Sequence, residues 1–400
     1  MSDTEQKVSP PIRFGGFSDD WEQRKFGEVF VEYSEKNHEE LPPLTIVQGK
    51  GTILREESDR SLIYDKSSLR GYKLVNKGDF ILHLRSFEGG LEVACSQGIV
   101  SPAYHLFHGK NADSRFYYPF FRSKHFISVL LKPHVYGIRD GKSIDVEGMK
   151  SIQIPYPEMD EQNRIGDFFS HLDSLTALYQ RKHDRLVRVK ASMLKKLFVQ
   201  GEDSVPRIRF GEYTAPWKKV KLGEIVLPYS DPVETPHDGY ERLGIRSHGK
   251  GVFHDYVAAG KELGTAQMHR VAAHKLIVNI TFAWEHAVAI TGDGDAGKLV
   301  SHRFPQFSMT DGIYDQFLKY LILDSRFRRH LVLSSPGGAG RNRVLKVPEM
   351  LEYETVIPEI EEQKQIAGYL NALDELIGLY QVRMEKLKNI KTAFLQKMFV

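Results

Sequence analysis

The sequence has a single cysteine, no long apolar run and almost no excess of charge, and each of these features excludes a class of protein. Of its 400 residues only Cys95 is a cysteine. An intrachain disulfide and a zinc site built on cysteine ligands are therefore excluded, which is typical of a protein of the reducing cytoplasm. The most apolar stretch, residues 276–284, is too short and too polar to cross a bilayer, and residues 1–11 lack the apolar segment of a signal peptide. We therefore expect a cytoplasmic protein without a membrane partner.

The charge balance leaves the class of binding partner open. The chain has 55 Lys and Arg against 52 Asp and Glu, a net charge of +3, so composition alone does not indicate a nucleic-acid-binding protein. A hydrophobic content of 41% and a charged content of 27% are those of an ordinary globular protein. The length is sufficient for two or three domains, each with its own core.

Two glycine-rich segments come close to a phosphate-binding loop without completing one. Residues 292–299, GDGDAGKL, have the required spacing of glycines and lysine, but Leu299 stands where a Ser or Thr must reach magnesium. The sequence that follows does not predict a helix. Residues 137–143, GIRDGKS, have one residue too few between the glycines. Both segments are therefore predicted to be turns.

No other catalytic or metal site is indicated. The Asp/Asn-Pro-Pro-aromatic motif of amino-methyltransferases is absent, and the histidines are scattered, without the i, i+4 pairing or the nearby carboxylate expected of a metal site. We therefore expect no catalytic residue, no metal and no cofactor in this chain. The histidines considered are His83, His105, His108, His237, His248, His254 and His302.

The chain contains an internal repeat, in which one module occurs twice. Residues 12–28, IRFGGFSDDWEQRKFGE, recur as residues 208–224, IRFGEYTAPWKKVKLGE, a shift of 196 positions. A second matched block recurs at a shift of 201 positions. Its shared pairs are Glu161/Glu362, Gln162/Gln363, Ile165/Ile366, Leu172/Leu373, Asp173/Asp374, Leu175/Leu376, Tyr179/Tyr380, Gln180/Gln381, Leu186/Leu387 and Lys190/Lys391.

Between the matched blocks lie two dissimilar inserts, residues 29–150 and 225–350. They have a similar spacing of hydrophobic residues but little identity. Their short runs of β-branched or aromatic residues, bounded by Gly, Pro, Asn and Asp, predict strands. Residues 116–131 and 314–332 predict one helix in each insert, and Phe116, Phe120 and Phe121 are expected on its core face. A duplicated frame with two different inserts favours two versions of one task, such as the reading of two different targets.

Each half ends in a long amphipathic helix that begins after Pro157 or Pro358. Apolar residues recur every seven positions, which is typical of coiled-coil packing, and the two helices can pair antiparallel. A helix of 38 residues would be about 55–60 Å long and would fix the distance between the inserts. The alternative is that each helix covers the core of its own domain. The predicted helix-packing residues are Ile165, Leu172, Tyr179, Leu186, Met193, Ile366, Leu373, Tyr380, Leu387 and Phe394.

The chain resembles the specificity (S) subunits of type I restriction–modification systems. The resemblance lies in residues 155–182 and 357–383, in the helix endings MLKKLF (193–198) and FLQKMF (394–399), and in the motifs GDF, SFEGG and GIVSPAY of the first insert. The second insert departs from it, with His274-Lys275-Leu276 in place of Gly-Asp-Phe. The resemblance covers essentially the whole chain.

The resemblance implies a mixed α/β (α+β) fold. Two target-recognition domains of the same fold would be separated by two long helices packed as an antiparallel coiled coil, in a pseudo-two-fold repeat. The expected boundaries are 1–157 and 201–357 for the recognition domains, and 158–200 and 358–400 for the spacer helices.

The resemblance also implies a non-catalytic function. Each domain would read one half of a split site on double-stranded DNA. The helices would set the spacing and dock two methyltransferase (modification) subunits, to which restriction subunits attach. S-adenosylmethionine, ATP and magnesium are then expected only in the partner subunits.

Base edges in the major groove are read by forked side chains, and glycine-rich turns allow these to approach closely. On this basis we expect DNA contacts from turns in both inserts, although each residue could equally be an ordinary solvated loop residue. The predicted contacts are Arg85, Ser86, Gly89, Gly90, Tyr136, Arg139, Lys142 and Ser143 in the first insert, and Arg246, His248, Lys250, Arg341, Asn342 and Arg343 in the second. The basic residues that crowd the end of the first helix could be a solvated face, contact DNA phosphates or meet an acidic partner.

Two other functions remain open from the residues alone. The chain could be a scaffold that assembles partners through its paired helices. It could also be a nucleotide-dependent nuclease that uses residues 292–299.

Overall fold

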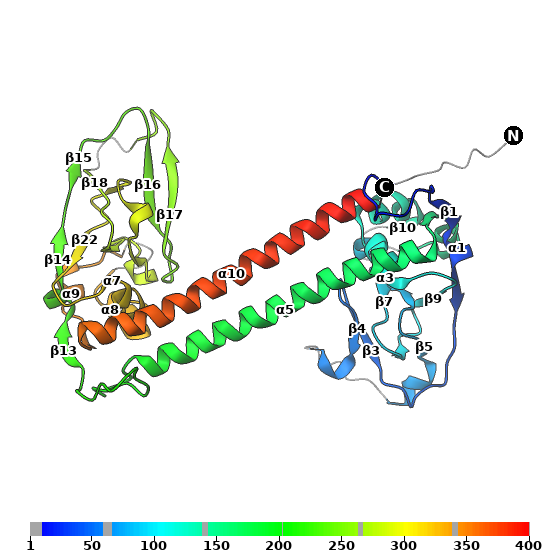
Figure 1. Ribbon diagram of the computed structural model, residues 1–400, viewed down its shortest axis with the longest axis horizontal. Helices are drawn as coiled ribbons and strands as arrows, with labels where there is room; N and C mark the ends of the chain where they lie inside the picture. Colours follow the sequence, from blue (N-terminus) through cyan, green and yellow to red (C-terminus); the bar gives the residue numbers. More distant parts are fainter. Residues whose placement is uncertain are drawn as a thin grey trace. The chain divides into compact units, whose positions relative to one another are not determined.

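The structure is a computed structural model that describes residues 10–58, 66–137, 143–201, 203–262, 267–337 and 343–399. The chain forms two compact units. Unit 1 comprises Met1–Lys182 with Tyr380–Val400, and unit 2 comprises His183–Leu379. The unit boundaries fall inside the two long helices α5 (Met159–Leu197) and α10 (Ile360–Met398), so each unit contains part of both (Figure 1).

Unit 1 is built on a four-stranded antiparallel sheet in the order β2-β9-β6-β7, with paired strands β1–β12, β3–β4, β5–β8 and β10–β11 around it. Its strands are β1 (Glu22–Lys25), β2 (Phe30–Tyr33), β3 (Leu44–Val47), β4 (Gly51–Leu54), β5 (Lys73–Val75), β6 (Phe80–Leu82), β7 (Glu92–Val93), β8 (Gly98–Val100), β9 (His105–Gly109), β10 (Val135–Tyr136), β11 (Ser143–Ile144) and β12 (Gln153–Tyr156). Its short helices are α1 (Phe26–Val29), η1 (Arg55–Glu57), η2 (Lys66–Gly71), α2 (Ser86–Gly89), α3 (Ser114–Phe121), η3 (Phe126–Leu131), η4 (Lys132–His134) and α4 (Val146–Lys150).

Unit 2 repeats this sheet in the order β14-β22-β19-β20. Its strands are β13 (Lys218–Lys221), β14 (Val226–Tyr229), β15 (Pro232–Val233), β16 (Tyr240–Ile245), β17 (Val252–Val257), β18 (Met268–Arg270), β19 (Lys275–Val278), β20 (Val288–Ile290), β21 (Leu299–Ser301), β22 (Gln306–Met309) and β23 (Glu354–Ile357). Its short helices are α6 (Leu222–Ile225), η6 (Ala283–Glu285), η7 (Asp293–Asp295), α7 (Asp315–Leu321), α8 (Ser325–Leu333) and α9 (Val347–Leu351).

The register of the two sheets shows that they are the same fold. Phe80 lies opposite Phe107 in unit 1, and Leu276 lies opposite Phe307 in unit 2. The structure thereby aligns Gly78 with His274, and both have a positive φ, +93° and +56°. The predicted mixed α/β repeat is confirmed, and the segment in which the sequence departs from Gly-Asp-Phe keeps its backbone conformation.

The inserts differ outside this sheet. In unit 2, β15, β18, β21, β16 and β17 form one five-stranded sheet, whereas the corresponding strands of unit 1 remain as the separate pairs β3–β4 and β5–β8.

The prediction of one continuous helix in each insert is wrong. Residues 116–131 divide into α3 and the π-helical η3, and residues 314–332 divide into α7 and α8. Polar side chains cap each new start: the Ser123 hydroxyl accepts a 3.0 Å hydrogen bond from Phe126 N, and the Asp324 carboxylate accepts one of 2.6 Å from Arg326 N. The expected core face of Phe116, Phe120 and Phe121 is confirmed, since all three side chains are buried.

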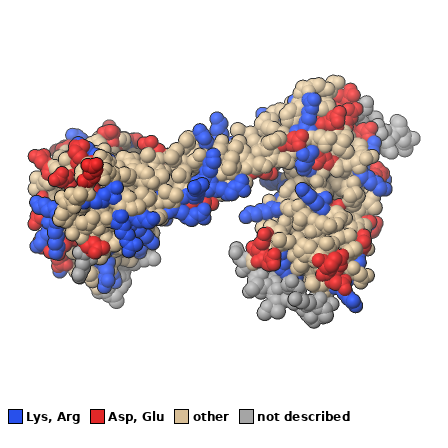
Figure 2. Space-filling model, turned by 60° about the horizontal axis from the view of Figure 1, so that its bottom comes forward, with Lys and Arg blue, Asp and Glu red and all other residues tan. Residues whose placement is uncertain are grey.

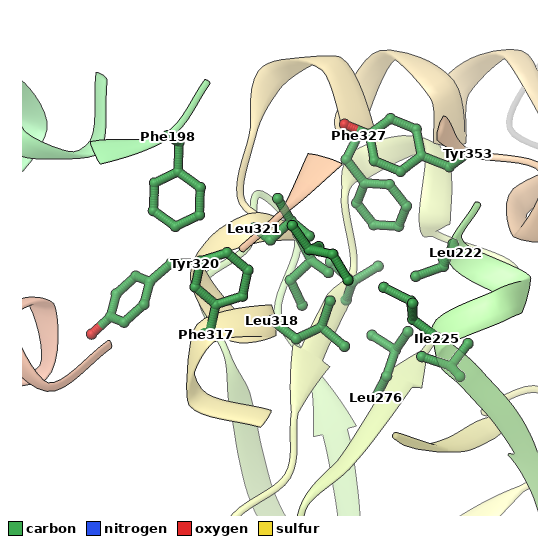
Figure 3. Close-up of a cluster of buried hydrophobic side chains, with 14 of the residues drawn as sticks. Phe198, Leu222, Ile225, Leu276, Phe317, Leu318, Tyr320, Leu321, Phe327 and Tyr353 are labelled. Atoms are coloured by element: carbon green, nitrogen blue, oxygen red, sulfur yellow. The ribbon is translucent and has the colours of Figure 1, made fainter. Parts of the chain in front are cut away.

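The core of each unit includes the end of the long helix that began in the other. Phe198, just after α5, packs in the core of unit 2 with its ring centroid 5.3 Å from that of Phe317 (Figure 3). Phe399, just after α10, packs in the core of unit 1 with its ring centroid 5.2 Å from that of Phe116. The two positions are the last aromatic residues of the repeated endings MLKKLF and FLQKMF, so the duplication extends to these contacts.

A buried hydrogen-bond cluster fixes the start of each long helix and explains the repeated Glu-Gln. Glu161 is buried, and its carboxylate accepts hydrogen bonds from Arg13 at 2.8 and 2.6 Å and from Trp21 Nε1 at 2.9 Å. The Gln162 side chain accepts from Asp113 N at 3.0 Å and donates to Pro157 O at 2.9 Å.

In unit 2, Glu362 pairs with Arg209 at 2.8 and 2.6 Å, and Gln363 accepts from Tyr314 N at 2.9 Å. One difference between the two clusters concerns the tryptophan. The buried indole N–H of Trp217, unlike that of Trp21, has no hydrogen-bond partner among the described residues.

Within each unit, α5 and α10 pack against each other, as the heptad pattern predicts. In unit 1 the ring centroids of Phe168 and Phe394 are 4.8 Å apart, and those of Tyr179 and Tyr380 are 5.6 Å apart. The sequence left open an alternative in which each helix covers the core of its own domain. The first turns of each helix do so. Of the predicted packing residues, Ile165, Ile366 and Leu373 are buried, and Leu172, Tyr179, Leu186, Met193, Tyr380, Leu387 and Phe394 are half-buried.

Candidate nucleic-acid interface

In unit 2 the structure brings two of the predicted segments together on η6. The turn between β16 and β17 is held on η6 by main-chain bonds, from His248 N to Glu285 O at 2.7 Å and from Gly249 N to His286 O at 2.9 Å. The Ser247 hydroxyl adds a 2.6 Å bond to the Glu285 carboxylate. Arg246, His248 and Lys250 on this turn are all exposed.

Arg343 reaches the same small helix from another direction. Its guanidinium lies over the Trp284 ring, 5.5 Å from the centroid, and its backbone bridges Gly337. The preceding predicted residues, Arg341 and Asn342, lie outside the described residues. Four of the six residues predicted in the second insert, Arg246, His248, Lys250 and Arg343, therefore lie on or beside η6.

A cleft of about 340 Å³ opens between the turn and η6. Its walls include the partly exposed rings of Phe253 and Phe282, and its polar lining includes Ser247, Asn279 and Glu285. The Arg246 guanidinium lies 5.2 Å from the Phe253 centroid, at the edge of this cleft. Unit 2 thus presents exposed aromatic and basic groups side by side, as base and phosphate contacts require.

In unit 1 the predicted residues of segment 83–90 differ in exposure: Arg85 is exposed, whereas Ser86, Gly89 and Gly90 are buried. The Arg85 side chain is exposed and forms an ion pair of 3.2 Å with Glu88. Ser86 is buried, and its hydroxyl accepts a 2.9 Å hydrogen bond from His83 N. Its side chain therefore stabilises the turn, and its contact with DNA stays a prediction.

Gly90 of this segment is needed by the fold, because it has φ +79° and a Cβ there would lie 2.0 Å from Phe121 O. Gly89 is buried, and a Cβ there would lie 2.2 Å from the amide nitrogen of Gln48, the end of a flexible side chain. Close packing thus accounts for Gly90, and a role of the two glycines at a DNA groove stays a prediction.

The positive charge of this segment comes from Arg85 alone near neutral pH. Burial, with help from the cations Arg122 and Arg85, lowers the pKa of His83 to about 4. His83 is therefore neutral and contributes no phosphate-binding charge.

The other predicted turn of the first insert lies between β10 and β11. Tyr136 and Ser143 face each other across this pair and both are exposed. Arg139 and Lys142 lie outside the described residues, as does the central part of GIRDGKS.

The turn between β3 and β4 is an exposed basic turn that was not among the predicted segments. Gln48, Gly49 and Lys50 are exposed, and the turn is fastened to the buried carboxylate of Glu92. That carboxylate accepts hydrogen bonds from Gly49 N at 2.8 Å and Gly51 N at 3.1 Å. The turn occupies the place that Ser247–Gly251 occupies in unit 2. The signal was present: Gly-Lys-Gly at 49–51 recurs at 249–251, a shift of 200 positions.

Residues 292–299 are a turn, as the sequence predicts. The strand β21 follows η7 directly, and Gly297 has φ +84°. The Lys298 ammonium donates to Gly294 O at 2.7 Å and lies 3.4 Å from Glu241, so it is held within the protein. This geometry does not support a nucleotide-binding loop.

The fold brings carboxylates from distant parts of the sequence to several histidines. His254 Nε2 lies 2.6 Å from Asp295, and His274 Nδ1 lies 2.7 Å from Asp315. The expectation that the histidines lack a nearby carboxylate is therefore wrong for the folded chain. Among the described residues, however, no cluster of three or more His, Cys, Asp or Glu could hold a metal ion.

Basic side chains line the exposed parts of the long helices (Figure 2). Some are engaged: Lys190 pairs with Asp374, and Lys391 pairs with Asp173 at 2.5 Å. Others, such as Arg181, Arg185 and Arg188, are exposed. None of the helices in the described part of the chain combines the length and the apolar character needed to cross a membrane.

Comparison with known proteins agrees with this arrangement. The family model "Type I restriction modification DNA specificity domain" matches residues 18–188. The type I restriction enzyme MjaVIII specificity subunit of Methanocaldococcus jannaschii is 25% identical over 399 residues, 93% of this chain and 90% of that protein. A second protein of that organism, the putative type I restriction enzyme MjaX specificity subunit, is 22% identical over 412 residues, 94% of this chain and 92% of that protein.

A solved structure has the same fold along the whole chain. The crystal structure of the type I restriction–modification S subunit from M. genitalium matches with a TM-score of 0.60 at 12% identity. The match covers 98% of this chain and 99% of that chain.

Proposed function

We propose, from the premise that this chain belongs to the type I restriction–modification specificity subunits, that units 1 and 2 each read one half of a two-part DNA site. The chain is the DNA-specificity subunit of such a complex: it binds DNA, assembles with other subunits and has no catalytic role of its own. The observation that carries the proposal is the repeated four-stranded sheet, which presents a different loop surface in each unit. Two different surfaces on one scaffold would define an asymmetric site.

In unit 2 the reading surface would be η6 with the turn Ser247–Gly251 and Arg343. Arginine can bond guanine through two hydrogen bonds, and exposed rings such as Phe282 can contact a thymine methyl group. In unit 1 it would be Arg85 with the turn Gln48–Gly51, together with Tyr136 and Ser143.

The long helices would set the distance between the two half-sites. Each has 39 residues, which at 1.5 Å per residue corresponds to about 58 Å. The reciprocal pairs Lys190–Asp374 and Lys391–Asp173 support this role, because they fix the antiparallel register near each end.

The helices would also dock two methyltransferase subunits. In unit 1, α10 has a shallow exposed trough whose apolar lining is Val382, Ile390 and Ala393 and whose charged lining is Glu385 and Lys386. Val382 is 67% exposed, which is unusual for a valine in the middle of a helix and favours a partner that covers it. Restriction subunits would join through the methyltransferase subunits, and S-adenosylmethionine, ATP and magnesium would be bound by those partners.

Sequencing of methylated bases in cells that carry the complete system tests the proposal. We expect two short specified blocks separated by a fixed unread gap. Arg246→Ala or Arg343→Ala should relax one block, and Arg85→Ala the other, each with a loss of about 1–3 kcal/mol of discrimination. A single uninterrupted methylated motif, or one block affected by all three substitutions, would contradict the two-reader proposal.

A further inference from the structure

The two inserts share one short motif at the same place in the fold. Gly49-Lys50-Gly51 and Gly249-Lys250-Gly251 are identical in inserts that otherwise have little identity. The first forms the turn of the β3–β4 hairpin, and the second forms the turn of the β16–β17 hairpin.

The fold explains the glycines of this motif. Gly49 and Gly51 have φ values of +83° and +77°, and Gly249 and Gly251 have values of +65° and +75°. A Cβ at Gly51 would also lie 2.5 Å from Val93 O. Left-handed backbone of this kind favours glycine, so the turn alone accounts for these residues.

The fold does not explain the lysine between them. Lys50 N donates to Val47 O at 2.9 Å, a main-chain bond that any residue except proline could make. The side chains of Lys50 and Lys250 are exposed, and neither ammonium forms a hydrogen bond or ion pair with a described residue. A cation that has no bond to a described residue, yet is the same in both inserts, is available to a ligand common to both units.

Both lysines lie on turns that pack against the expected DNA-reading segments. In unit 1 the Gln48 side chain packs against Gly89, in the segment that carries Arg85. In unit 2 the turn is bonded to Glu285 and His286, in the segment that carries Phe282. The neighbours of the motif differ between the units, with Gln48 replaced by His248 and Val47 by Ser247.

We propose that Lys50 and Lys250 are matched phosphate anchors, one in each unit, which hold the DNA backbone while the differing neighbours read bases. The inference rests on the proposed function and assigns roles within it. Phosphates are the part of DNA that is the same at every sequence, so a contact kept in two readers of different sequences is best directed at them. The two anchors would place both units on the duplex by the same contact.

The test uses the complex of the full chain with its modification subunits. Binding is measured from 50 to 200 mM salt to a duplex with the methylated target sequence and to a scrambled duplex. Lys50→Ala and Lys250→Ala are compared with Lys77→Ala and Lys261→Ala, which remove exposed lysines that precede β6 and follow β17 and lie outside the Gly-Lys-Gly turns.

Each anchor substitution should weaken binding to both duplexes alike, about five- to tenfold at 0.1 M salt, and reduce the slope of log K against log salt by about one. The double variant should reduce the slope by about two, and Lys50→Arg should keep it. The control substitutions should match the wild type.

Several outcomes would overturn the assignment. If the anchor variants bind DNA as the two control variants do, and the wild type binds normally, the anchor proposal is wrong. The proposed function is then unaffected. A loss confined to the target duplex would make the lysines base readers and contradict phosphate anchoring. A wild-type complex that binds neither duplex overturns the proposed function, and the anchors with it.

Discussion

The ammonium of Lys190 on α5 contacts the carboxylate of Asp374 on α10 within unit 2. Unit 1 contains the same pair with the helices exchanged, since Lys391 on α10 lies 2.5 Å from Asp173 on α5. The pairs differ in their surroundings. The Tyr320 hydroxyl lies 2.8 Å from the Asp374 carboxylate, whereas Pro119, which has no donor, occupies the corresponding position in unit 1.

This difference predicts unequal coupling in the two pairs. A double-mutant cycle on Lys190→Ala and Asp374→Ala should give about 1 kcal/mol, and the cycle on Lys391→Ala and Asp173→Ala about 0.5 kcal/mol or less, because Asp173 is more exposed to water. Tyr320→Phe should bring the first value toward the second. Unfolding free energies measured by denaturant titration would check this, and equal coupling in both pairs would contradict it.

The aromatic residues at the helix ends should stabilise one unit each. Phe399→Ala removes a buried ring from the core of unit 1 and should cost about 3–5 kcal/mol. Hydrogen exchange should then rise in residues 114–121 and remain unchanged in residues 315–321. Phe198→Ala is the matched variant with the reverse pattern, and exchange that rises equally in both units would refute the assignment.

The two repeated tryptophans should tolerate phenylalanine unequally. Trp21 Nε1 donates to the buried carboxylate of Glu161 at 2.9 Å, whereas the buried Trp217 indole has no described partner. Trp21→Phe should therefore cost about 1.5–3 kcal/mol more than Trp217→Phe, since the change in ring size is common to both. Calorimetric unfolding of the two variants would check this, and equal losses would show that the indole bond is unimportant.

Substitution of His274 should have an effect on stability that depends on pH. The hydrogen bond with Asp315, and more weakly that with Asp293, raises the pKa of His274 above its usual value. The charged histidine then stabilises unit 2 fully below the unfolded pKa of about 6.5. This stabilisation is lost as pH rises through the higher folded pKa.

His274→Asn is the suitable variant, because asparagine tolerates the positive φ of +56° while it lacks the charge. The Tm of the variant should lie furthest below that of the wild type near pH 6, and the gap should narrow by pH 9. A gap that stays constant across this range would show that the imidazolium is not involved.

The trough on α10 offers a test of methyltransferase docking. Val382→Asp places a charge among the apolar residues that line the trough. It should weaken association with the modification subunits by at least about tenfold, because an unpaired charge is costly to bury. Gln381→Asp adds the same charge at a neighbouring exposed position and should have little effect. Calorimetric titration would compare the two, and equal losses would exclude a specific role for the trough.

The repeated frame could be predicted from the sequence because it depends on local patterns. Heptad spacing located both long helices and their packing, and the leading segments with Trp21 and Trp217 marked the two copies. The breaks at Ser123 and Asp324 were missed, because the capping bonds compete there with a hydrophobic pattern that continues through them.

The candidate interface was predictable only in part. Exposed basic turns such as Arg85 and Arg246 follow from side-chain chemistry, but the burial of Ser86 depends on a turn that only the folded chain defines. The turn Gln48–Gly51 was missed because its match in the second insert is only three residues long. The role of Phe399 could not be inferred from heptads, since its partners Trp21 and Phe116 lie more than 280 positions earlier in the chain.

The placement of Phe198 and Phe399 limits how such proteins can exchange their inserts. Each ring packs against an aromatic residue that the neighbouring insert supplies, Phe317 for Phe198 and Phe116 for Phe399. A transplanted insert would therefore have to bring its own receiving ring, whatever bases it reads. Recombination between related genes should give a folded protein where that ring is retained and an unfolded one where it is lost. The ability to fold, and not DNA recognition, would then decide which new combinations of half-sites can arise.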